Sequence, residues 1–342
     1  MRVLHFIHSY TPPHIPEQDI YLVEKGFSDY KRFWNVLKET TPDVIHMRAT
    51  GKETFGIYAL IAFLHRIKVV RTLYAPIMFT YWYILKQLCA RHLYGHTICT
   101  SKYDMDHIDQ YHLAGKSKRS LIYRGIDLIP TTEILKKDTA RSFIYKKLGI
   151  AFTKNIRIVG TVIRQDEGNG VEHLIDAAYL ADKYKNLTNT IFVILHDGHV
   201  DSALQKQIEN SHVQGICFIV DQVENPEQYI PAFDIFISPR TSSGDLYTLL
   251  TAMYMHVPCI ATRVGDAYEF EPFVAAPLVP MQSAKFLTEA LMYVIQHESP
   301  TSAKLRSKIP ALPKKLTHEH ELMAVKDIYH KVIRKIKHIT IS

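Results

Sequence analysis

Several features that are scarce in this chain of 342 residues exclude particular classes of protein and of binding site. Only 14 residues are glycine, which indicates that some Gly-rich ligand loops are missing. No run of about 18 apolar residues occurs, so we expect no transmembrane helix. The opening MRVLHFIHSY is too short and too polar for a signal peptide. The most membrane-like stretch, residues 75–84 (APIMFTYWYI), fits a core element or an interfacial contact better than a membrane span.

Cysteine is scarce as well, and the four cysteines are Cys89, Cys99, Cys217 and Cys259. They form no CxxC pair and no zinc spacing, so neither a disulfide framework nor a zinc finger is indicated. Three lie in apolar strand-like runs and Cys89 lies in an apolar helix-like run. We therefore expect buried free thiols and a reducing, cytoplasmic location, with the inner face of a membrane as the second candidate.

What the chain does contain is ordinary for a globular protein. Hydrophobic residues make up 47% and charged residues 22%, and the length predicts two domains. The formal net charge of +7 fits a basic soluble protein, or attraction to an anionic surface such as membrane lipid. No RNA- or DNA-binding motif accompanies the charge, so nucleic acid is not an expected partner.

Short apolar runs alternate with helix-length segments along the chain, as in proteins with buried parallel strands. In the first part the runs lie at residues 3–7, 44–46, 69–73, 97–99 and 120–123. In the second part they lie at residues 156–162, 190–195, 216–220, 235–238, 259–262 and 276–279. This pattern predicts the α/β class, with two Rossmann-like parallel-sheet domains at 1–130 and 156–316 that face a central cleft.

Two segments fall outside these domains. Residues 131–155 are rich in Lys and polar residues, and we interpret them as a linker with one short helix. Residues 317–342 form a basic amphipathic helix and tail, with apolar residues at helical spacing. Two interpretations of this helix stay open: it is docked on the domain surface, or it lies on a membrane surface.

Six segments in order are similar to motifs of one enzyme family. They are residues 42–46 (PDVIH), 122–128 (IYRGIDL), 159–175 (VGTVIR, then GVEHLI), 194–198 (ILHDG), 232–239 (AFDIFISP) and 249–269 (LLTAMYMHVPCIATRVGDAYE). The chain thus resembles the GT-B glycosyltransferases of the retaining family four type, the group 1 glycosyl transferases, which include many lipopolysaccharide and capsule enzymes. The resemblance covers nearly the whole chain and is strongest in the second half.

The resemblance implies a nucleotide-diphosphate sugar as donor, no metal and no other cofactor. Arg164 falls on the family's Arg position and would clamp the diphosphate, because preorganised positive charge stabilises the leaving group. The family's Lys position holds Asn169, which can donate a hydrogen bond but carries no charge. The donor-binding residues implied in this way are Thr161, Arg164, Asn169, Asp197, Ser243, Gly244, Asp245, Leu246, Thr251 and Glu269.

The donor loop departs from the family pattern. The family's Glu-Gly-Phe-Gly is replaced by residues 243–246 (SGDL), and a second Glu is replaced by Thr251, so both carboxylates are lost. Gly244 still lets the backbone approach a phosphate at the start of a helix expected at 243–256, which Ser242 and Ser243 would cap. Asp245 would take over a sugar contact, or is an ordinary acid in the first helical turn.

The first domain departs as well. Its acceptor-side candidates are His14, Pro16 and Glu17, where the family often has a Gly-Gly pair and where proline offers no backbone N–H. Tyr74 falls at the usual active-site His and is a poor base at neutral pH. Arg164, Asp245 and Tyr74 are the candidate catalytic residues. The sequence shows no strand–helix pair of the family type before Trp34, so we expect a shortened domain.

Two functions follow. One is an enzyme, a hexosyltransferase that moves a sugar to a glycan or lipid-linked acceptor in polysaccharide or lipopolysaccharide biosynthesis. The other is a degenerate GT-B pseudo-enzyme that binds a glycan or assists a partner glycosyltransferase. No metal site is expected, because residues 318–321 (HEHE) lack the HExxH spacing and Asp104-Met105-Asp106 fits a helix start.

Overall fold

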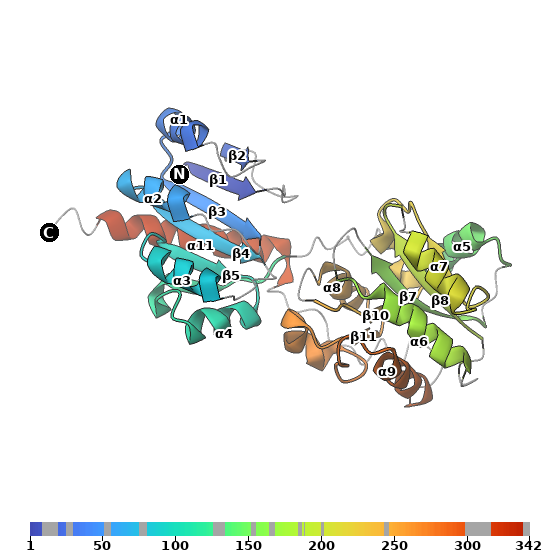
Figure 1. Ribbon diagram of the computed structural model, residues 1–342. Helices are drawn as coiled ribbons and strands as arrows, with labels where there is room; N and C mark the ends of the chain where they lie inside the picture. Colours follow the sequence, from blue (N-terminus) through green and yellow to red (C-terminus); the bar gives the residue numbers. More distant parts are fainter. Residues whose placement is uncertain are drawn as a thin grey trace. The chain divides into compact units, whose positions relative to one another are not determined.

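The computed structural model describes residues 1–8, 20–24, 30–50, 56–74, 81–125, 134–151, 155–163, 168–183, 187, 189–199, 202–242, 246–297 and 316–337. The chain divides into two compact units. The first unit comprises Met1–Gly125 together with Lys314–Ser342, and the second comprises Ile126–Pro313. Each unit is a parallel sheet covered by helices, as the sequence predicted (Figure 1).

The first unit is built on a sheet whose described strands follow the order β2-β1-β3-β4-β5-β6. The strands are β1 (Val3–His8), β2 (Ile20–Glu24), β3 (Val44–Thr50), β4 (Lys68–Tyr74), β5 (His96–Cys99) and β6 (Arg119–Leu121). The helices are α1 (Tyr30–Thr40), α2 (Gly56–Leu64), α3 (Tyr81–Ala90), α4 (Lys102–Gln110), the 3-10 turn η1 (Lys116–Lys118) and α11 (His318–Lys337). Helices α2, α3 and α4 lie on one face of this sheet and α11 on the other (Figure 1).

Strand β2 is a difference from the sequence analysis, which found no strand between β1 and Trp34. Ile20–Glu24 pairs in parallel with β1, so that Leu4 lies opposite Ile20 and Phe6 opposite Leu22. The strand is five residues long, lies at the edge of the sheet and begins with four apolar residues, Ile20 to Val23. The first domain therefore keeps a strand that was expected to be missing.

Side chains alternate across the first sheet, and the alternation explains why both faces are covered. Leu4, Phe6 and Ile45 pack under α1 to α4.

Helix α4 begins where Ser101 Oγ accepts a hydrogen bond from the Asp104 amide at 3.0 Å. The triplet Asp104-Met105-Asp106 therefore lies in the first turns of a helix, as the sequence predicted.

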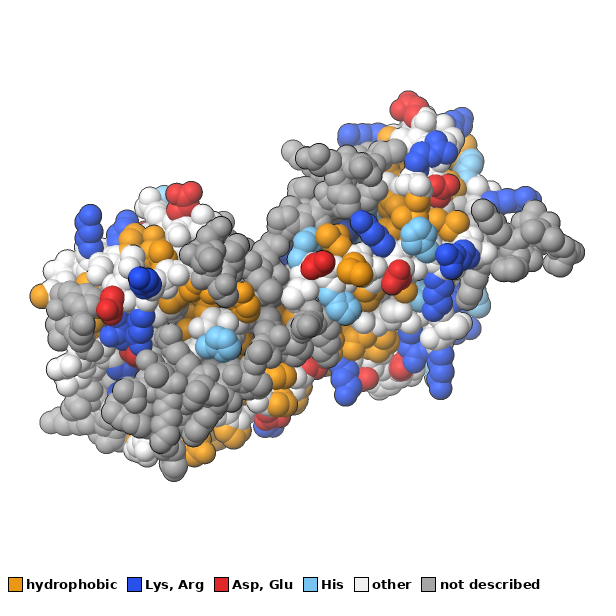
Figure 2. Space-filling model, turned by 180° about the vertical axis from the view of Figure 1, so that it is seen from behind, with side chains coloured by type: hydrophobic (Ala, Val, Ile, Leu, Met, Phe, Trp, Pro, Cys, Tyr) orange, Lys and Arg blue, Asp and Glu red, His pale blue; other side chains and the backbone are white. Residues whose placement is uncertain are grey.

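Helix α11 covers the opposite face. Its side chains Val325, Ile328, Tyr329 and Val332 are buried against a cluster on the sheet that includes Val44. Burial of side chains of this size stabilises the docked helix by about 1.5–3 kcal/mol each. The outward face of α11 is polar apart from exposed Met323, and Figure 2, seen from behind, shows charged and His side chains interspersed with hydrophobic ones over this side of the unit. The apolar face is therefore covered by the chain's own sheet and is not offered to a membrane, which corrects the second interpretation of this helix.

The second unit has a sheet whose described strands follow the order β11-β10-β7-β8-β9. The strands are β7 (Arg157–Ile163), β8 (Thr190–His196), β9 (Cys217–Val220), β10 (Ile235–Ser238) and β11 (Cys259–Ala261). The helical elements are α5 (Lys137–Leu148), α6 (Val171–Lys183), α7 (Ser202–Asn210), η2 (Pro226–Ala232), α8 (Tyr247–Tyr254), η3 (Gly265–Phe273) and α9 (Ala284–His297). Residues 276–279, expected as a strand, contribute a single bridge between Val279 and Thr262.

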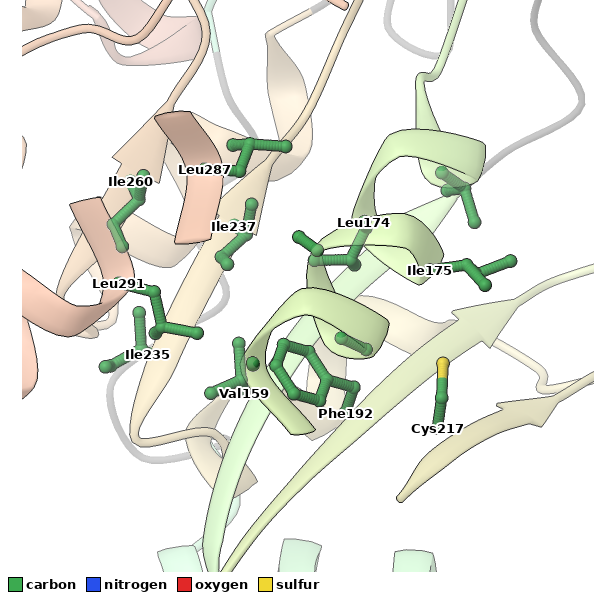
Figure 3. Close-up of a cluster of buried hydrophobic side chains, with 14 of the residues drawn as sticks. Val159, Leu174, Ile175, Phe192, Cys217, Ile235, Ile237, Ile260, Leu287 and Leu291 are labelled. Carbon is green, nitrogen blue, oxygen red and sulfur yellow. The ribbon is translucent and has the colours of Figure 1, made fainter. Parts of the chain in front are cut away.

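One apolar core fixes α6 and α9 on this sheet (Figure 3). Leu174 of α6 and Leu291 of α9 meet Val159, Phe192 and Ile235 of the strands there. The helices thereby hold the central strands in register, and the ends of those strands define the candidate site described below.

Helix α5 belongs to the second unit, although its sequence lies in the segment interpreted as a linker. Lys137 and Arg141 of α5 both form ion pairs with Asp234, directly before β10. The same carboxylate accepts a hydrogen bond from the Ile158 amide of β7 at 2.8 Å. The ring of Phe143 stacks on Tyr229 of η2, with 3.9 Å between the ring centroids.

The cysteines differ in part from the expectation of buried thiols. Cys99, Cys217 and Cys259 are buried, but Cys89 on α3 is exposed. Burial raises the pKa of the Cys99 and Cys217 thiols to about 12 and raises that of Cys259 further. Within the described residues, no helix is long and apolar enough to cross a membrane.

Candidate functional site

The strand order of the second sheet marks one place where a ligand fits. From the central strand β7 the chain proceeds to β8 and β9 on one side, and later to β10 and β11 on the other. The loops after β7 and β10 therefore leave the sheet in opposite directions. In open α/β sheets, ligands bind at such a switch point, outside the carboxyl ends of the strands.

Backbone hydrogen bonds join the segments at this edge. The amide of Thr241, after β10, donates to the carbonyl of Gly168, after β7, at 2.9 Å. The hydroxyl of Thr262, after β11, donates to the carbonyl of Arg240 at 2.6 Å, and its amide donates to Ser238 at 3.1 Å. Hydrogen bonds thus connect the segments that follow β7, β10 and β11, and we call these connected segments the frame of strand ends.

Two glycines make the close approach in this frame feasible. Gly168 and Gly170 have φ values of 76° and 71°, in the left-handed region that side-chain-bearing residues rarely adopt. A Cβ atom on Gly170 would lie 1.9 Å from the Pro239 carbonyl oxygen, and one on Gly168 would lie 2.1 Å from Ser242 Oγ. The loop after β7 therefore requires glycine at both positions.

Two helices begin at this edge and direct their N-termini towards it. Asn169 Oδ1 accepts a hydrogen bond from the first amide of α6, at Val171, at 3.1 Å. Leu246 takes the N-cap position of α8 and has no side-chain oxygen to satisfy the first amides there. Helix N-termini carry partial positive charge and bind phosphate groups. The expected helix at 243–256 with a serine cap is corrected here, because α8 begins at Tyr247.

Other predicted donor residues lie around this frame. Thr161 is buried within β7, and Asp197 is exposed directly after β8. The turn at Asp197 is fixed because the amide of Gly198 donates to His196 Nδ1 at 2.8 Å. Glu269 is half-buried in η3, directly beyond β11.

Thr251 lies on the buried face of α8, where its hydroxyl donates to the carbonyl of Tyr247 at 2.8 Å. Thr251 can therefore accept a hydrogen bond from a ligand through its hydroxyl oxygen, but it carries no charge. This differs chemically from the second Glu of the family, which falls at this position.

Several predicted residues lie outside the described residues, namely Arg164, Ser243, Gly244, Asp245, His14, Pro16 and Glu17. Of Tyr74 the structure describes the backbone, as the last residue of β4. The functional assignments of all these residues stay predictions. In the part of the chain that the structure describes, no group of three or more His, Cys, Asp or Glu residues could hold a metal ion.

Sequence reasoning missed Arg240. This half-buried residue directly follows Pro239 at the end of β10, so it brings a second cation to the switch point besides the predicted Arg164. The signal was present in the sequence, because a basic residue after a predicted buried strand lies at the ligand-binding edge of a parallel sheet.

Both halves of the chain match family models. Residues 3–129 match Glycosyltransferase Family 4, and residues 153–297 match Glycosyl transferases group 1. No curated protein matches the chain in sequence.

Solved structures share the fold over nearly the whole chain. A glycosyltransferase from Rickettsia africae is 15% identical with a TM-score of 0.71, and the match covers 97% of this chain and 98% of that one. HepE from Anabaena, solved with UDP and glucose, is 15% identical with a TM-score of 0.73, covering 97% and 100%. WaaG, a glycosyltransferase of lipopolysaccharide biosynthesis, is 12% identical with a TM-score of 0.61, covering 90% and 94%.

Two parallel-sheet α/β units with these likenesses define a GT-B protein. The chain belongs to the group 1 glycosyltransferases of this fold. The resemblance inferred from the sequence motifs is thereby confirmed for family and fold, and family and neighbours together support sugar transfer.

Proposed function

We propose that the protein is a hexosyltransferase that moves a sugar from a nucleotide-diphosphate donor to a glycan or lipid-linked acceptor of a cell-surface polysaccharide or lipopolysaccharide. The donor diphosphate would lie at the switch point of the second sheet. Arg164 and Arg240 would neutralise it, and the N-termini of α6 and α8 would add backbone amides. No metal or other cofactor is part of this proposal.

The frame of strand ends is the observation that carries the proposal. Gly168 and Gly170 hold the loop after β7 against the loop after β10. Arg164 follows the last residue of β7, and Arg240 follows β10 by two residues. A leaving diphosphate gains charge as the glycosidic bond breaks, so two guanidinium groups in a preformed frame stabilise the transition state more than the ground state.

The second candidate function is a pseudo-enzyme that binds a glycan or assists an active glycosyltransferase. This candidate is favoured because two positions that carry charged side chains in the family carry uncharged side chains here. Asn169 replaces the Lys and engages its side-chain oxygen at the start of α6, and the hydroxyl of Thr251 is engaged within α8. Loss of one hydrogen-bond donor to a developing oxyanion costs about 2.7–4 kcal/mol of transition-state stabilisation in other enzymes, so the missing Lys would weaken catalysis substantially.

Calorimetric titration with UDP, GDP, ADP and their common sugars tests the proposal. We expect one nucleotide to bind, and Arg164→Ala or Arg240→Gln to weaken binding at least about tenfold through the lost charge-assisted hydrogen bonds. Arg157→Gln is the matched control, because Arg157 lies at the other end of β7. Absence of nucleotide binding by folded protein would overturn the donor site and favour the pseudo-enzyme.

A further inference from the structure

Helix α4 of the first unit carries a row of aromatic rings. Tyr103, His107 and Tyr111, which directly follows the last residue of α4, recur every four residues and so lie in one row along the helix. The ring centroids of Tyr103 and His107 are 4.2 Å apart, and those of His107 and Tyr111 are 6.3 Å apart. Tyr111 packs partly against the core of the unit, whereas Tyr103 is 38% exposed. The row therefore leads from the core to the surface.

Polar groups lie beside this row. Asp106 and Gln110 are exposed and follow the same interval of four residues, one position before His107 and Tyr111. Nδ1 of His107 lies 2.8 Å from the Tyr103 carbonyl oxygen, which can only accept, so Nδ1 donates and the neutral ring keeps Nε2 as an acceptor. We call the surface formed by these five side chains the α4 face. It combines ring faces with groups that donate and accept hydrogen bonds.

The charge of α4 disfavours a polyanionic partner. The first unit contains 24 Lys or Arg and 13 Asp or Glu, but α4 reverses this balance with three Asp and one Lys. A nucleic acid would stack bases on the rings, but its phosphates would meet the exposed carboxylate of Asp106. The α4 face also contains no aliphatic side chain, so a hydrophobic protein surface has little to bury there. An uncharged partner rich in hydroxyl groups fits this chemistry best.

We propose that the α4 face binds an extended, uncharged glycan chain along the side of the helix. A pyranose ring has apolar C–H faces, which stack on aromatic rings, and hydroxyl groups around its rim. Asp106 and Gln110 bond those hydroxyls. The row from Tyr103 to Tyr111 covers about 12 Å of helix axis, enough for about two or three sugar units. This surface is a binding site and not a catalytic one, and it does not depend on sugar transfer at the second sheet.

Binding of β-1,4-linked glucans without any nucleotide sugar tests the proposal on the native protein. These glucans are uncharged and extended, and their sugar rings are flat with apolar faces. Electrophoresis in gels that contain hydroxyethyl cellulose should retard the protein relative to gels without it. Calorimetric titration with glucose, cellobiose, cellotriose and cellohexaose should show affinity rising at least about tenfold from glucose to cellotriose. Cellohexaose should gain little more, because the row ends at Tyr111.

Three substitutions locate the binding. Tyr103→Ala removes the most exposed ring of the row and should weaken glucan binding at least about tenfold. Tyr103→Phe keeps the ring and should leave binding within about twofold, because stacking needs the ring face and not the hydroxyl. Tyr293→Ala is the matched control, because Tyr293 on α9 of the second unit is 49% exposed and lies outside the α4 face. It should leave binding unchanged.

The α4 face and the donor site can fail separately. Arg240→Gln should leave glucan binding unchanged, and Tyr103→Ala should leave nucleotide binding unchanged. The α4 proposal is overturned if the native protein binds none of these glucans, whatever its nucleotide binding. It is also overturned if Tyr293→Ala or Tyr103→Phe weakens glucan binding as much as Tyr103→Ala does. Should Tyr103→Ala fail to fold, the dependence on glucan length in the native protein decides, since equal affinity for glucose and cellotriose contradicts a row of stacking rings.

Discussion

The hydroxyl of Tyr329 on α11 lies 2.5 Å from Nδ1 of His46 on β3, although 283 positions separate the two residues. Nε2 of the same imidazole lies 2.6 Å from the hydroxyl of Thr72 on β4. Both ring nitrogens are therefore engaged inside the protein. Burial, with Arg48 and His5 nearby, lowers the pKa of His46 well below its ordinary value of 6.5. A neutral imidazole thus links the C-terminal helix to the first sheet.

Removal of the Tyr329 hydroxyl should loosen this link. Tyr329→Phe leaves a buried ring nitrogen of His46 without its partner, which costs about 1–3 kcal/mol of unfolding free energy. Denaturant unfolding measures the loss, and hydrogen exchange of α11 amides should accelerate. Tyr293→Phe is the control, because the Tyr293 side chain is 49% exposed. Equal effects of the two substitutions would contradict the role of the buried contact.

The lowered pKa of His46 predicts how stability depends on pH. The folded protein keeps His46 neutral, whereas the unfolded chain takes up a proton as pH falls below 6.5. The stability that this group contributes is therefore present above pH 6.5 and lost below it, by up to about 1.4 kcal/mol per pH unit. Thermal unfolding midpoints of wild type and His46→Gln between pH 5 and 8 measure the difference. A difference independent of pH would contradict this assignment.

The carboxylate of Asp234 should matter more to stability than an exposed one. Asp234→Asn leaves the buried guanidinium of Arg141 without its counter-charge, at a cost of about 3–5 kcal/mol. Asp109→Asn breaks the Arg119 pair, whose carboxylate side chain is 41% exposed, and should cost about 0–1 kcal/mol. Denaturant unfolding of both variants tests the ranking, and a reversed order would show that α5 is held by other contacts.

Glycine at position 170 should be required for donor binding. In Gly170→Ala the new Cβ atom meets the Pro239 carbonyl at a left-handed φ, so the loop after β7 must move away from β10. We expect the affinity for the nucleotide to fall at least about tenfold, together with a stability loss of about 1–3 kcal/mol. Gly215→Ala is the control, because a Cβ atom there meets nothing within 4 Å. Unchanged binding by folded Gly170→Ala protein would place the donor elsewhere.

Thiol labelling should separate one cysteine from the other three. Cys89 is exposed, whereas burial raises the pKa of Cys99 and Cys217 to about 12 and so suppresses their thiolates. A colorimetric thiol reagent at pH 8 should modify one group per native chain and four after unfolding. The variant Cys89→Ser should show no fast phase, and a remaining fast phase would mean that a second thiol is accessible.

The sequence predicted the two parallel sheets because apolar segments recur along the chain between helix-length segments. The central strands β3, β4 and β7 each contain adjacent apolar residues, Val44-Ile45, Val69-Val70 and Ile158-Val159, and these are buried because both faces of the sheets are covered. Strand β2 was missed even though its first four residues, Ile20 to Val23, are apolar. Cys89 was expected to be buried because its helix is apolar, but α3 also exposes apolar residues such as Leu85.

The candidate site was predictable in its location and less so in its contacts. Gly170 and Asn169 were found through the family motif, but their roles depend on contacts that sequence spacing does not reveal. The Pro239 carbonyl approaches Gly170 from a strand about 70 residues later, and Asn169 accepts the first amide of α6. Arg240 was missed because it has no counterpart in the motif.

The docking of α11 has a consequence for how the chain matures during synthesis. The second unit, Ile126–Pro313, is continuous and leaves the ribosome complete before α11 appears. Until then, the face of the first sheet that carries Val44 and His46 lacks the helix that covers it in the folded protein. The first unit is thus completed after the second, and its apolar strip stays exposed on the translating ribosome until α11 emerges.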